Sequence, residues 1–248
     1  MTENYASRAE ILKLARVLDV TPERLEYLAR VDADDLRAFR EQVTDRLFDA
    51  NLTVLQRMAL AARLIPAPVL AKIAEKVFGP LLCARIAGLV DVSRGVDVAK
   101  RLDPPFLASV AADLDPRRAS AIIARIPLET VVAVANELAR REDWITLGRF
   151  VGHLPDPTVR RSLDVVDDPG LLRIAFVLDD KSRIDHVMGL LPKGRLAGLI
   201  TAAGADEQLW APALDMLAHL GEARREAVRP LLDTLPGDLR DRAQATIK

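Results

Sequence analysis

The amino-acid sequence predicts an all-α protein in which short helices stack into a solenoid, and three observations lead to this prediction. Half of the 248 residues are apolar, but aromatic residues make up only 4% of the chain. The apolar residues are mainly Leu, Ala, Val and Ile, a mixture that favours helices packed on helices over strands. A short phrase, an apolar residue followed by Asp or Pro, recurs between residues 102 and 204, and the apolar residues between its copies lie on one helical side.

The recurring phrase marks the starts of the predicted helices. It begins at 102, 114 and 126, then at 154, 166 and 178, and again at 191, as in Leu102-Asp103-Pro104, Leu114-Asp115-Pro116 and Leu154-Pro155-Asp156-Pro157. Asp accepts hydrogen bonds from the free amides at a helix start, and Pro fits the first turn, where its missing N–H costs nothing. Each unit of roughly 12–13 residues holds one helix that is too short to be stable alone, so neighbouring helices must pack into a repeat.

We expect two sections along the chain. Residues 1–100 are predicted to form a less regular N-terminal helical section, continuous with a helical-repeat solenoid over residues 101–248 that ends in a polar capping helix. At the start of the first section, Ser7 and Glu10 fit a capping box, in which the serine caps the helix and the glutamate bonds back to it.

Residues 100–205, with their Leu-Asp-Pro and Leu-Pro helix starts, resemble the N-terminal cytosolic domain of MgtE-type magnesium transporters. That domain in turn resembles the helical repeats of the flagellar motor switch protein FliG. The resemblance implies a right-handed superhelix of short helices. In the transporters the domain takes part in magnesium sensing, through acidic residues that face a following pair of CBS domains. The 248 residues contain no CBS pair and no membrane domain, so we carry no metal ligand across.

Charge and cysteine content exclude several classes of protein. The formal net charge is −1, which gives no global field for recruiting nucleic acid. A helix-turn-helix cadence near residues 14–22 lies in a net acidic stretch, so we do not expect nucleic acid as a partner. The single cysteine, Cys83, excludes an internal disulfide and is expected to be a buried, inert thiol. We find no signal peptide and no spanning apolar run, and we expect a cytoplasmic protein.

No pattern of catalytic residues appears in the sequence. It has no Gly-rich phosphate loop, nucleophile elbow or paired catalytic acids, and its three histidines are scattered. Asp215 and His219 are spaced to make one local helical pair, and the paired aspartates of the repeat are explained as helix caps. We therefore predict no enzymatic activity, no cofactor and no metal site.

Two surfaces are candidates for binding. Our first hypothesis is a non-enzymatic scaffold that presents a superhelical surface to a protein partner. Its candidate partner surface consists of arginine pairs near the ends of the units: Arg117, Arg118, Arg140, Arg141, Arg160 and Arg161. The simpler interpretation of the same pairs is a solvated face balanced by neighbouring acids.

The alternative is a peripheral membrane- or lipid-binding protein that acts through the apolar, basic segment 52–92. Amphipathic helices with lysines on the polar side can lie on anionic membranes. The candidate residues are Lys72, Lys76, Arg85, Phe78, Leu81 and Leu82. The same segment could instead form the buried centre of the solenoid or the face of a homodimer, and the sequence leaves these alternatives open.

Overall fold

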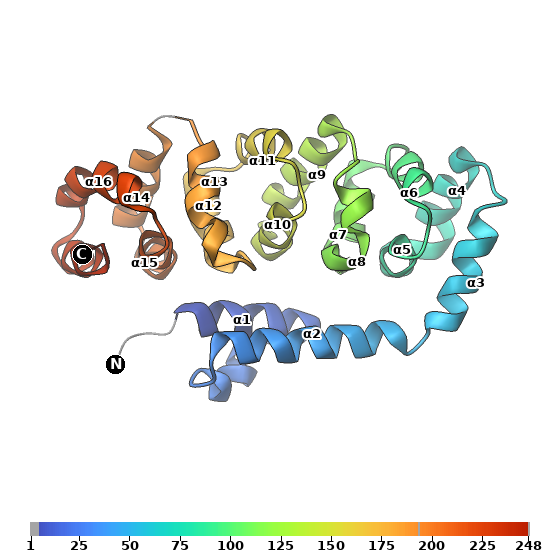
Figure 1. The fold of residues 1–248 in the computed structure, drawn as a ribbon, viewed down its shortest axis with the longest axis horizontal. Coiled ribbons are helices and arrows are strands. Elements are labelled where there is room, and N and C mark those ends of the chain that lie inside the picture. Colours follow the sequence, from blue (N-terminus) through green and yellow to red (C-terminus); the bar gives the residue numbers. More distant parts are fainter. Residues whose placement is uncertain (1–4, 193, 248) are drawn as a thin grey trace. The chain divides into compact units, whose positions relative to one another are not determined.

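The computed structural model describes residues 5–192 and 194–247 (Figure 1). Within these residues it contains seventeen α-helices, five shorter 3-10 or π segments and no strand, so the predicted all-α fold is confirmed. The chain divides into two compact units: unit 1 is Met1–Arg40 with Val166–Lys248, and unit 2 is Glu41–Val165. The units therefore change at residues 40/41 and 165/166.

Unit 2 holds most of the repeat. Helix α2 (Ala33–Asp49) enters it with its second half. The elements that follow are α3 (Leu52–Ala62), α4 (Ala67–Ile73), the π segment η2 (Ala74–Phe78), α5 (Gly79–Ala87), α6 (Val92–Ala99), α7 (Pro104–Asp113), α8 (Pro116–Ile123), α9 (Leu128–Arg140), α10 (Trp144–Val151) and α11 (Asp156–Leu163).

Unit 1 combines the two ends of the chain. Its N-terminal elements are α1 (Tyr5–Val17), η1 (Pro22–Leu28) and the first half of α2. Its C-terminal elements are α12 (Asp168–Val177), η3 (Lys181–Arg183), α13 (Ile184–Leu190), α14 (Arg195–Ala205), η4 (Glu207–Leu209), α15 (Trp210–Ala218), α16 (Glu222–Val228), η5 (Arg229–Thr234) and α17 (Gly237–Thr246).

The Asp and Pro residues of the recurring phrase begin helices as predicted. Helices α7 and α8 start at Pro104 and Pro116, each directly after an aspartate. The Asp115 carboxylate accepts a hydrogen bond from the Arg117 amide at 3.1 Å, and Asp167 accepts one from the Gly170 amide at 2.8 Å. These contacts satisfy amides that no helical carbonyl can reach, which explains why the helices begin there.

Helix starts recur with a period of 52 residues. Helices α3, α7 and α11 begin at residues 52, 104 and 156, and α6 and α10 begin at residues 92 and 144. One period holds four successive helices, which corresponds to four of the predicted units of roughly 12–13 residues. We call the sets α3–α6, α7–α10 and α11–α14 the first, second and third repeats.

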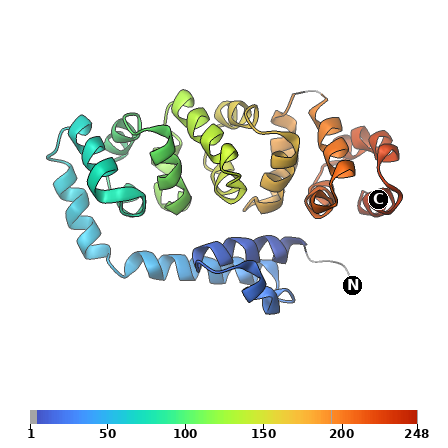
Figure 2. The same cartoon turned by 180° about the vertical axis from the view of Figure 1, so that it is seen from behind.

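Within unit 2 the helices pack in two interleaved rows. Helices α3, α5, α7, α9 and α11 pack each on the next, and α4 packs on α6, which packs on α8 (Figures 1 and 2). Small and branched side chains fill the space between the rows, among them Ala84, Leu107, Val110 and Ile123. This packing of short helices on neighbours is compatible with the predicted solenoid.

In unit 1 the N-terminal helix packs on C-terminal helices. Helix α12 packs on α14 and α15, and α1 packs on both α12 and α15. Leu14 of α1 is fully buried. The predicted Ser7–Glu10 capping box is wrong, because the helix already includes Tyr5 and Ser7 lies inside it. The Ser7 hydroxyl instead donates a hydrogen bond to the Val31 carbonyl at 2.7 Å, and Glu10 is buried.

Candidate functional site

Large apolar side chains are exposed at the start of the first repeat. We define the α3–α5 apolar surface by six of them: Val54, Leu60, Leu64, Val69, Val77 and Leu81. Leu64 is 88% exposed and Val77 is 73% exposed. The opposite side of α3 buries Leu55 and Ala59, so this helix is apolar on two sides. A surface helix normally presents polar residues to solvent, and exposed apolar groups gathered on consecutive elements indicate a binding surface.

The predicted basic residues of this segment lie partly on the same elements. Lys72 and Lys76 are exposed, and they lie between Val69 and Val77 along α4 and η2. Of the other predicted residues, Leu81 is 53% exposed, whereas Arg85, Phe78 and Leu82 are half-buried. The segment thus presents a mixed apolar and basic face to solvent.

Cys83 lies beneath this surface on α5 and is half-buried. Its Sγ lies 3.9 Å from the Ala74 carbonyl oxygen, and burial raises the pKa of the thiol to about 11. A thiol with that pKa is almost fully protonated at neutral pH and is a poor nucleophile. The thiol is therefore inert, as the sequence predicts, although it is not fully buried.

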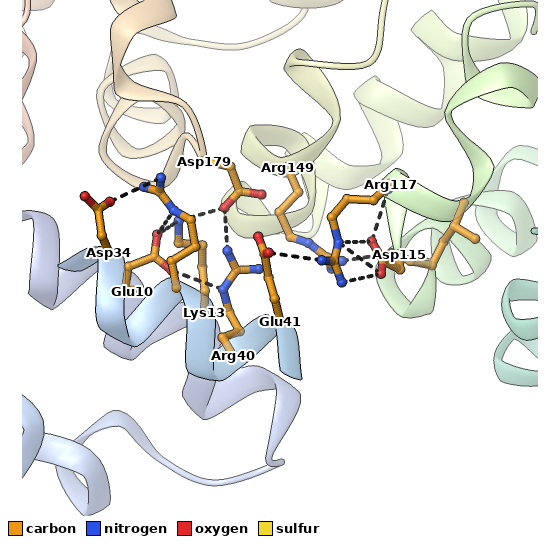
Figure 3. Close-up of polar contacts among 11 residues, drawn as sticks. Glu10, Lys13, Asp34, Arg40, Glu41, Asp115, Arg117, Arg149 and Asp179 are labelled. Atoms are coloured by element: carbon orange, nitrogen blue, oxygen red, sulfur yellow. Dashed lines mark hydrogen bonds and ion pairs between the residues drawn. The ribbon is translucent and has the colours of Figure 1, made fainter. Parts of the chain in front are cut away.

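The first predicted arginine pair belongs to an ion-pair network of unit 2. The Arg117 guanidinium lies 3.1 Å from Glu41 and 2.8 Å from Asp115, and Figure 3 shows it pointing toward both carboxylates. Arg118 donates a hydrogen bond to Asp45 at 2.8 Å, and its guanidinium carbon lies 3.9 Å from the centre of the Phe48 ring. This pair holds the second half of α2 on α8.

Burial by itself would raise the pKa of Asp115, whose side chain is 9% exposed. Hydrogen bonds from Arg117 and the positive charges of Arg117 and Arg149 outweigh that effect, and the net pKa is lowered. Asp115 therefore stays ionised at neutral pH while it caps α8. Arg117 and Arg118 thus have a structural role, because their guanidinium groups already contact carboxylates of the chain. These contacts would compete with the binding of a partner.

The remaining predicted arginines lie on other helices. Arg140, the last residue of α9, and Arg141, which follows it, both contact the Glu137 carboxylate at 2.7 Å. Arg141 also donates to the Pro105 carbonyl at 2.8 Å. On α11, Arg161 contacts Asp164 at 3.1 Å, and Arg160 is exposed. Most of these arginines thus have an acidic neighbour in the chain, and each pair contacts its own set of carboxylates.

The contacts of Glu137 with Arg140 and Arg141 can be tested through the pH dependence of folding stability. Hydrogen bonds from Arg140 and Arg141 lower the pKa of Glu137 from 4.5 to about 2. A carboxylate with a lowered folded pKa stabilises the fold above its unfolded pKa, and this contribution is lost as pH falls toward the folded pKa. We expect Glu137→Gln to be less stable than wild type by a constant amount above about pH 5, with the difference vanishing near pH 2.

Urea unfolding at a series of pH values measures that difference. Glu129→Gln, on the same helix and exposed, serves as the matched control. A Glu137→Gln difference that stays the same from pH 7 to pH 2 would contradict the assignment.

Arginines of α6, α10 and α14 make a recurring contact with the junction that follows the first helix of each repeat. Arg94 donates to the Ala62 carbonyl at 2.9 Å, and Arg149 donates to the Leu114 carbonyl at 3.0 Å. Arg195 donates to the Val166 carbonyl and also pairs with the Asp168 carboxylate. These bonds satisfy carbonyl groups at helix ends and hold the fourth helix of a repeat on the first junction.

A buried charge network lies in unit 1, and sequence reasoning missed it. The Lys13 ammonium contacts Glu10 at 2.5 Å and Asp179 at 2.8 Å. Arg40 contacts the same two carboxylates, each at 3.0 Å, and Figure 3 shows the four side chains converging. Arg37 completes the network at 3.4 Å from Glu10. We call these five residues the α1 charge network; the side chains of Glu10, Lys13 and Arg40 are less than 10% exposed.

A second buried pair lies in the same unit. The Lys181 ammonium contacts Asp215 at 2.5 Å and donates to the Ala175 carbonyl at 3.0 Å. Burial lowers the pKa of Lys181, and the charge of Asp215 opposes this effect. His219 lies next to the pair, with Nδ1 2.7 Å from the Asp215 carbonyl oxygen, so the predicted Asp215–His219 contact is confirmed.

The paired aspartates serve the fold. Asp167 and Asp180 accept bonds from helix-start amides, whereas Asp168 and Asp179 pair with cations. Gly198 lets Asp168 lie close to α14, since a side chain there would collide with its carboxylate. Across residues 5–192 and 194–247, no group of three or more His, Cys, Asp or Glu is placed to hold a metal ion. None of the helices in these residues is long and apolar enough to cross a membrane.

The resemblance of residues 100–205 to the MgtE-type domain stays a prediction, because comparisons of the chain with protein-family models, with curated proteins and with solved structures find no match.

Proposed function

We propose that this protein is a non-enzymatic helical-repeat scaffold that binds a protein partner on the α3–α5 apolar surface. The observation that carries the proposal is the exposure of Val54, Leu60, Leu64, Val69, Val77 and Leu81. Apolar side chains gathered on consecutive elements gain free energy when a partner removes them from water.

The position of this surface in the repeat supports the proposal. Helices α3 and α4 are the first helices of the first repeat, and they pack on α5 and α6. The terminal helices of a repeat array need a polar outer face to remain soluble. The last helix, α17, has such a face, with Asp238, Arg240, Asp241 and Arg242, whereas α3 exposes Val54, Leu60 and Leu64. A partner that packs on α3 and α4 would supply the missing cap.

Site-specific photo-crosslinking in cells that produce the protein tests this function. A photo-reactive amino acid at Leu64 is expected to give a crosslinked protein adduct, because this side chain is the most exposed of the six. Ser120, which is exposed on α8 of the same unit, is the matched control position. The adduct should disappear when Val54 and Leu60 are both changed to Gln. Equal labelling from Leu64 and Ser120 would overturn the proposal.

A second candidate function is binding to an anionic membrane, and the exposed Lys72 and Lys76 beside Val69 and Val77 favour it. Lysines beside apolar side chains suit a membrane surface. Flotation with vesicles of phosphatidylcholine and phosphatidylserine in equal parts tests it at low salt. Membrane binding predicts co-flotation that is lost in a Lys72→Glu/Lys76→Glu variant, and failure to float at low salt excludes this function.

A further inference from the structure

In the second and third repeats, a carboxylate at the start of the second helix interacts electrostatically with an arginine of the fourth helix. In the second repeat Asp115 caps α8, and the charge of Arg149 from α10 lowers the pKa of Asp115. In the third repeat Asp168 begins α12 and pairs with Arg195 from α14. In both cases the arginine also donates to the carbonyl just before the cap residue of that helix. The third repeat thus pairs a carboxylate at this helix start directly with an arginine from its fourth helix. In the second repeat the carboxylate pairs with Arg117 of its own helix and is affected by the charge of Arg149.

The first repeat keeps the arginine but lacks the carboxylate. Its second helix, α4, begins with Pro66 and Ala67, and neither residue carries an acid. Arg94 still donates to the Ala62 carbonyl, yet its Nε is buried and has no hydrogen-bond partner among the described residues. The nearby acid, Asp91, contacts Arg63 at 3.0 Å. The corner between α3 and α4 therefore has two arginines and one carboxylate.

This corner adjoins the α3–α5 apolar surface. Leu60 and Leu64 lie within four residues of Ala62 along the chain, and both are exposed. Residues 51–100 contain seven basic and three acidic residues, a net charge of +4. An apolar surface bordered by positive charge, with a guanidinium that lacks a carboxylate, is complementary to an apolar helix that carries acids.

We propose that the corner between α3 and α4 is the specificity element of the docking surface, and that its partner is an acidic amphipathic helix. A carboxylate at the start of the partner helix pairs with Arg94, in the role that Asp168 has toward Arg195 in the third repeat. Leu60 and Leu64 pack on the apolar face of that helix. This inference rests on the proposed function and adds the chemistry of the partner.

The charge of residues 51–100 and the burial of the Arg94 Nε favour an acidic helix over a second copy of the chain and over a lipid headgroup. A second copy of the chain would bring two segments of net positive charge, residues 51–100 of each copy, against each other, which like-charge repulsion opposes. A lipid headgroup lies at a membrane surface, whereas the unpartnered Nε of Arg94 is buried. The Arg94 residue as a whole is only half-buried, so a side chain that projects from a partner helix can approach its guanidinium group.

Two stapled helical peptides test the inference by fluorescence anisotropy. The first begins Asp-Asp-Pro, continues with leucines at i, i+3, i+4 and i+7, and has glutamate at its other positions. The second has the same leucines, with asparagine and glutamine in place of the acids. We expect wild type to bind the acidic peptide at least about tenfold more tightly than the amide peptide, because charge-assisted hydrogen bonds are the stronger kind.

Variants of Arg94 and Pro66 test whether the preference for the acidic peptide arises at the corner between α3 and α4. Arg94→Gln is expected to abolish it, whereas Arg149→Gln, the same change in the second repeat, should preserve it. Pro66→Asp supplies the missing carboxylate within the chain, so it should also abolish the preference without lowering the thermal midpoint. This second variant removes no group that stabilises the fold, and it keeps the test decisive if Arg94→Gln fails to fold.

Three results of the peptide experiment overturn the inference: equal binding of both peptides, no binding of the acidic peptide at millimolar concentration, or an acid preference that survives Pro66→Asp. Sedimentation velocity provides a fourth. The inference fails if the chain self-associates and Leu64→Gln breaks that association. Binding to the phosphatidylserine vesicles without any binding of the acidic peptide also overturns it in favour of a membrane. If Leu64 still crosslinks to a protein while the acid preference is absent, the proposed function stands and only this inference fails. Loss of the Leu64 crosslink removes both.

Discussion

A Glu10→Gln variant is expected to lose about 3–5 kcal/mol of folding stability, because it removes the more buried of the two carboxylates that two buried cations share. Glu10 contacts both Lys13 and Arg40, and its side chain is 2% exposed. The neutral amide cannot offset the desolvation of these cations, whose only other carboxylate in the network is Asp179. For a chain of this length the loss corresponds to a fall in Tm of roughly 10 °C.

Thermal and urea unfolding measure this loss, and hydrogen exchange locates it. The amides of α1 should exchange faster in the variant, since the α1 charge network joins α1 to Asp179 after α12. Glu26→Gln, the same substitution at an exposed position of η1, is the control and should change stability by less than about 0.5 kcal/mol. A Glu10→Gln variant as stable as this control would show that the network does not hold α1.

Lys13→Met is expected to be milder, with a loss of about 1–3 kcal/mol. After this change Glu10 and Asp179 both keep their contacts with Arg40 at 3.0 Å. A larger loss of folding stability in Glu10→Gln than in Lys13→Met would therefore support the observed contacts of the network, and not only its presence.

The second large effect is expected for Asp215→Ala, with a loss of about 2–4 kcal/mol at pH 7. The carboxylate of Asp215 is 4% exposed and is the acidic partner of Lys181, whose side chain is 12% exposed. Without it, the ammonium group keeps carbonyl contacts with Ala175 and Phe176 but has lost its nearest opposite charge.

This loss should shrink as pH rises. Burial already lowers the pKa of Lys181, and removal of Asp215 takes away a charge that raises it. When the folded pKa lies below the unfolded one, the unfolded chain binds the proton more tightly, so stability rises with pH between the two values. The stability of Asp215→Ala relative to wild type should therefore increase from pH 7 toward pH 10.

Urea unfolding across this pH range measures the change, and Asp215→Leu/Lys181→Met is the control. The double variant replaces a buried pair by apolar groups of similar size, so it should be more stable than Asp215→Ala at pH 7 and should lack the rise. An Asp215→Ala deficit that is independent of pH would show that Lys181 is not the group left unpaired.

Much of the local structure could be predicted from the sequence, because helix starts depend on short-range contacts. Pro104 and Pro116 begin helices directly after aspartates, as the recurring phrase predicts. A cap bond such as that from the Gly170 amide to Asp167 joins residues three positions apart, so the sequence alone contains both partners. The Ser7–Glu10 prediction failed because the spacing of the two residues cannot distinguish a glutamate that bonds back to a helix start from one that is buried in ion pairs, as Glu10 is.

The candidate site was only partly predictable. The segment 52–92 is apolar and basic in the sequence, but only the fold shows that Leu60 and Leu64 are exposed while Leu55 is buried. Each helix in this stretch has apolar residues on more than one side, and the neighbouring helices that pack on it decide which side is buried. The sequence pattern does not indicate that the Nε of Arg94 is buried and lacks a hydrogen-bond partner. The absence of a carboxylate there becomes clear only when Arg94 is compared with Arg195, which pairs with Asp168.

The sequence by itself determined the all-α class, the helix starts and the repeat, because all three depend on residues close together in the chain. Only the tertiary structure decided that α1 packs on α12 and α15, and that Glu10, Lys13 and Arg40 meet Asp179. Lys13 and Asp179 are 166 positions apart, and no periodicity encodes such a contact. The charges on the inner side of α1, beside the fully buried Leu14, were the one available signal, since a buried charge needs a partner from elsewhere in the chain.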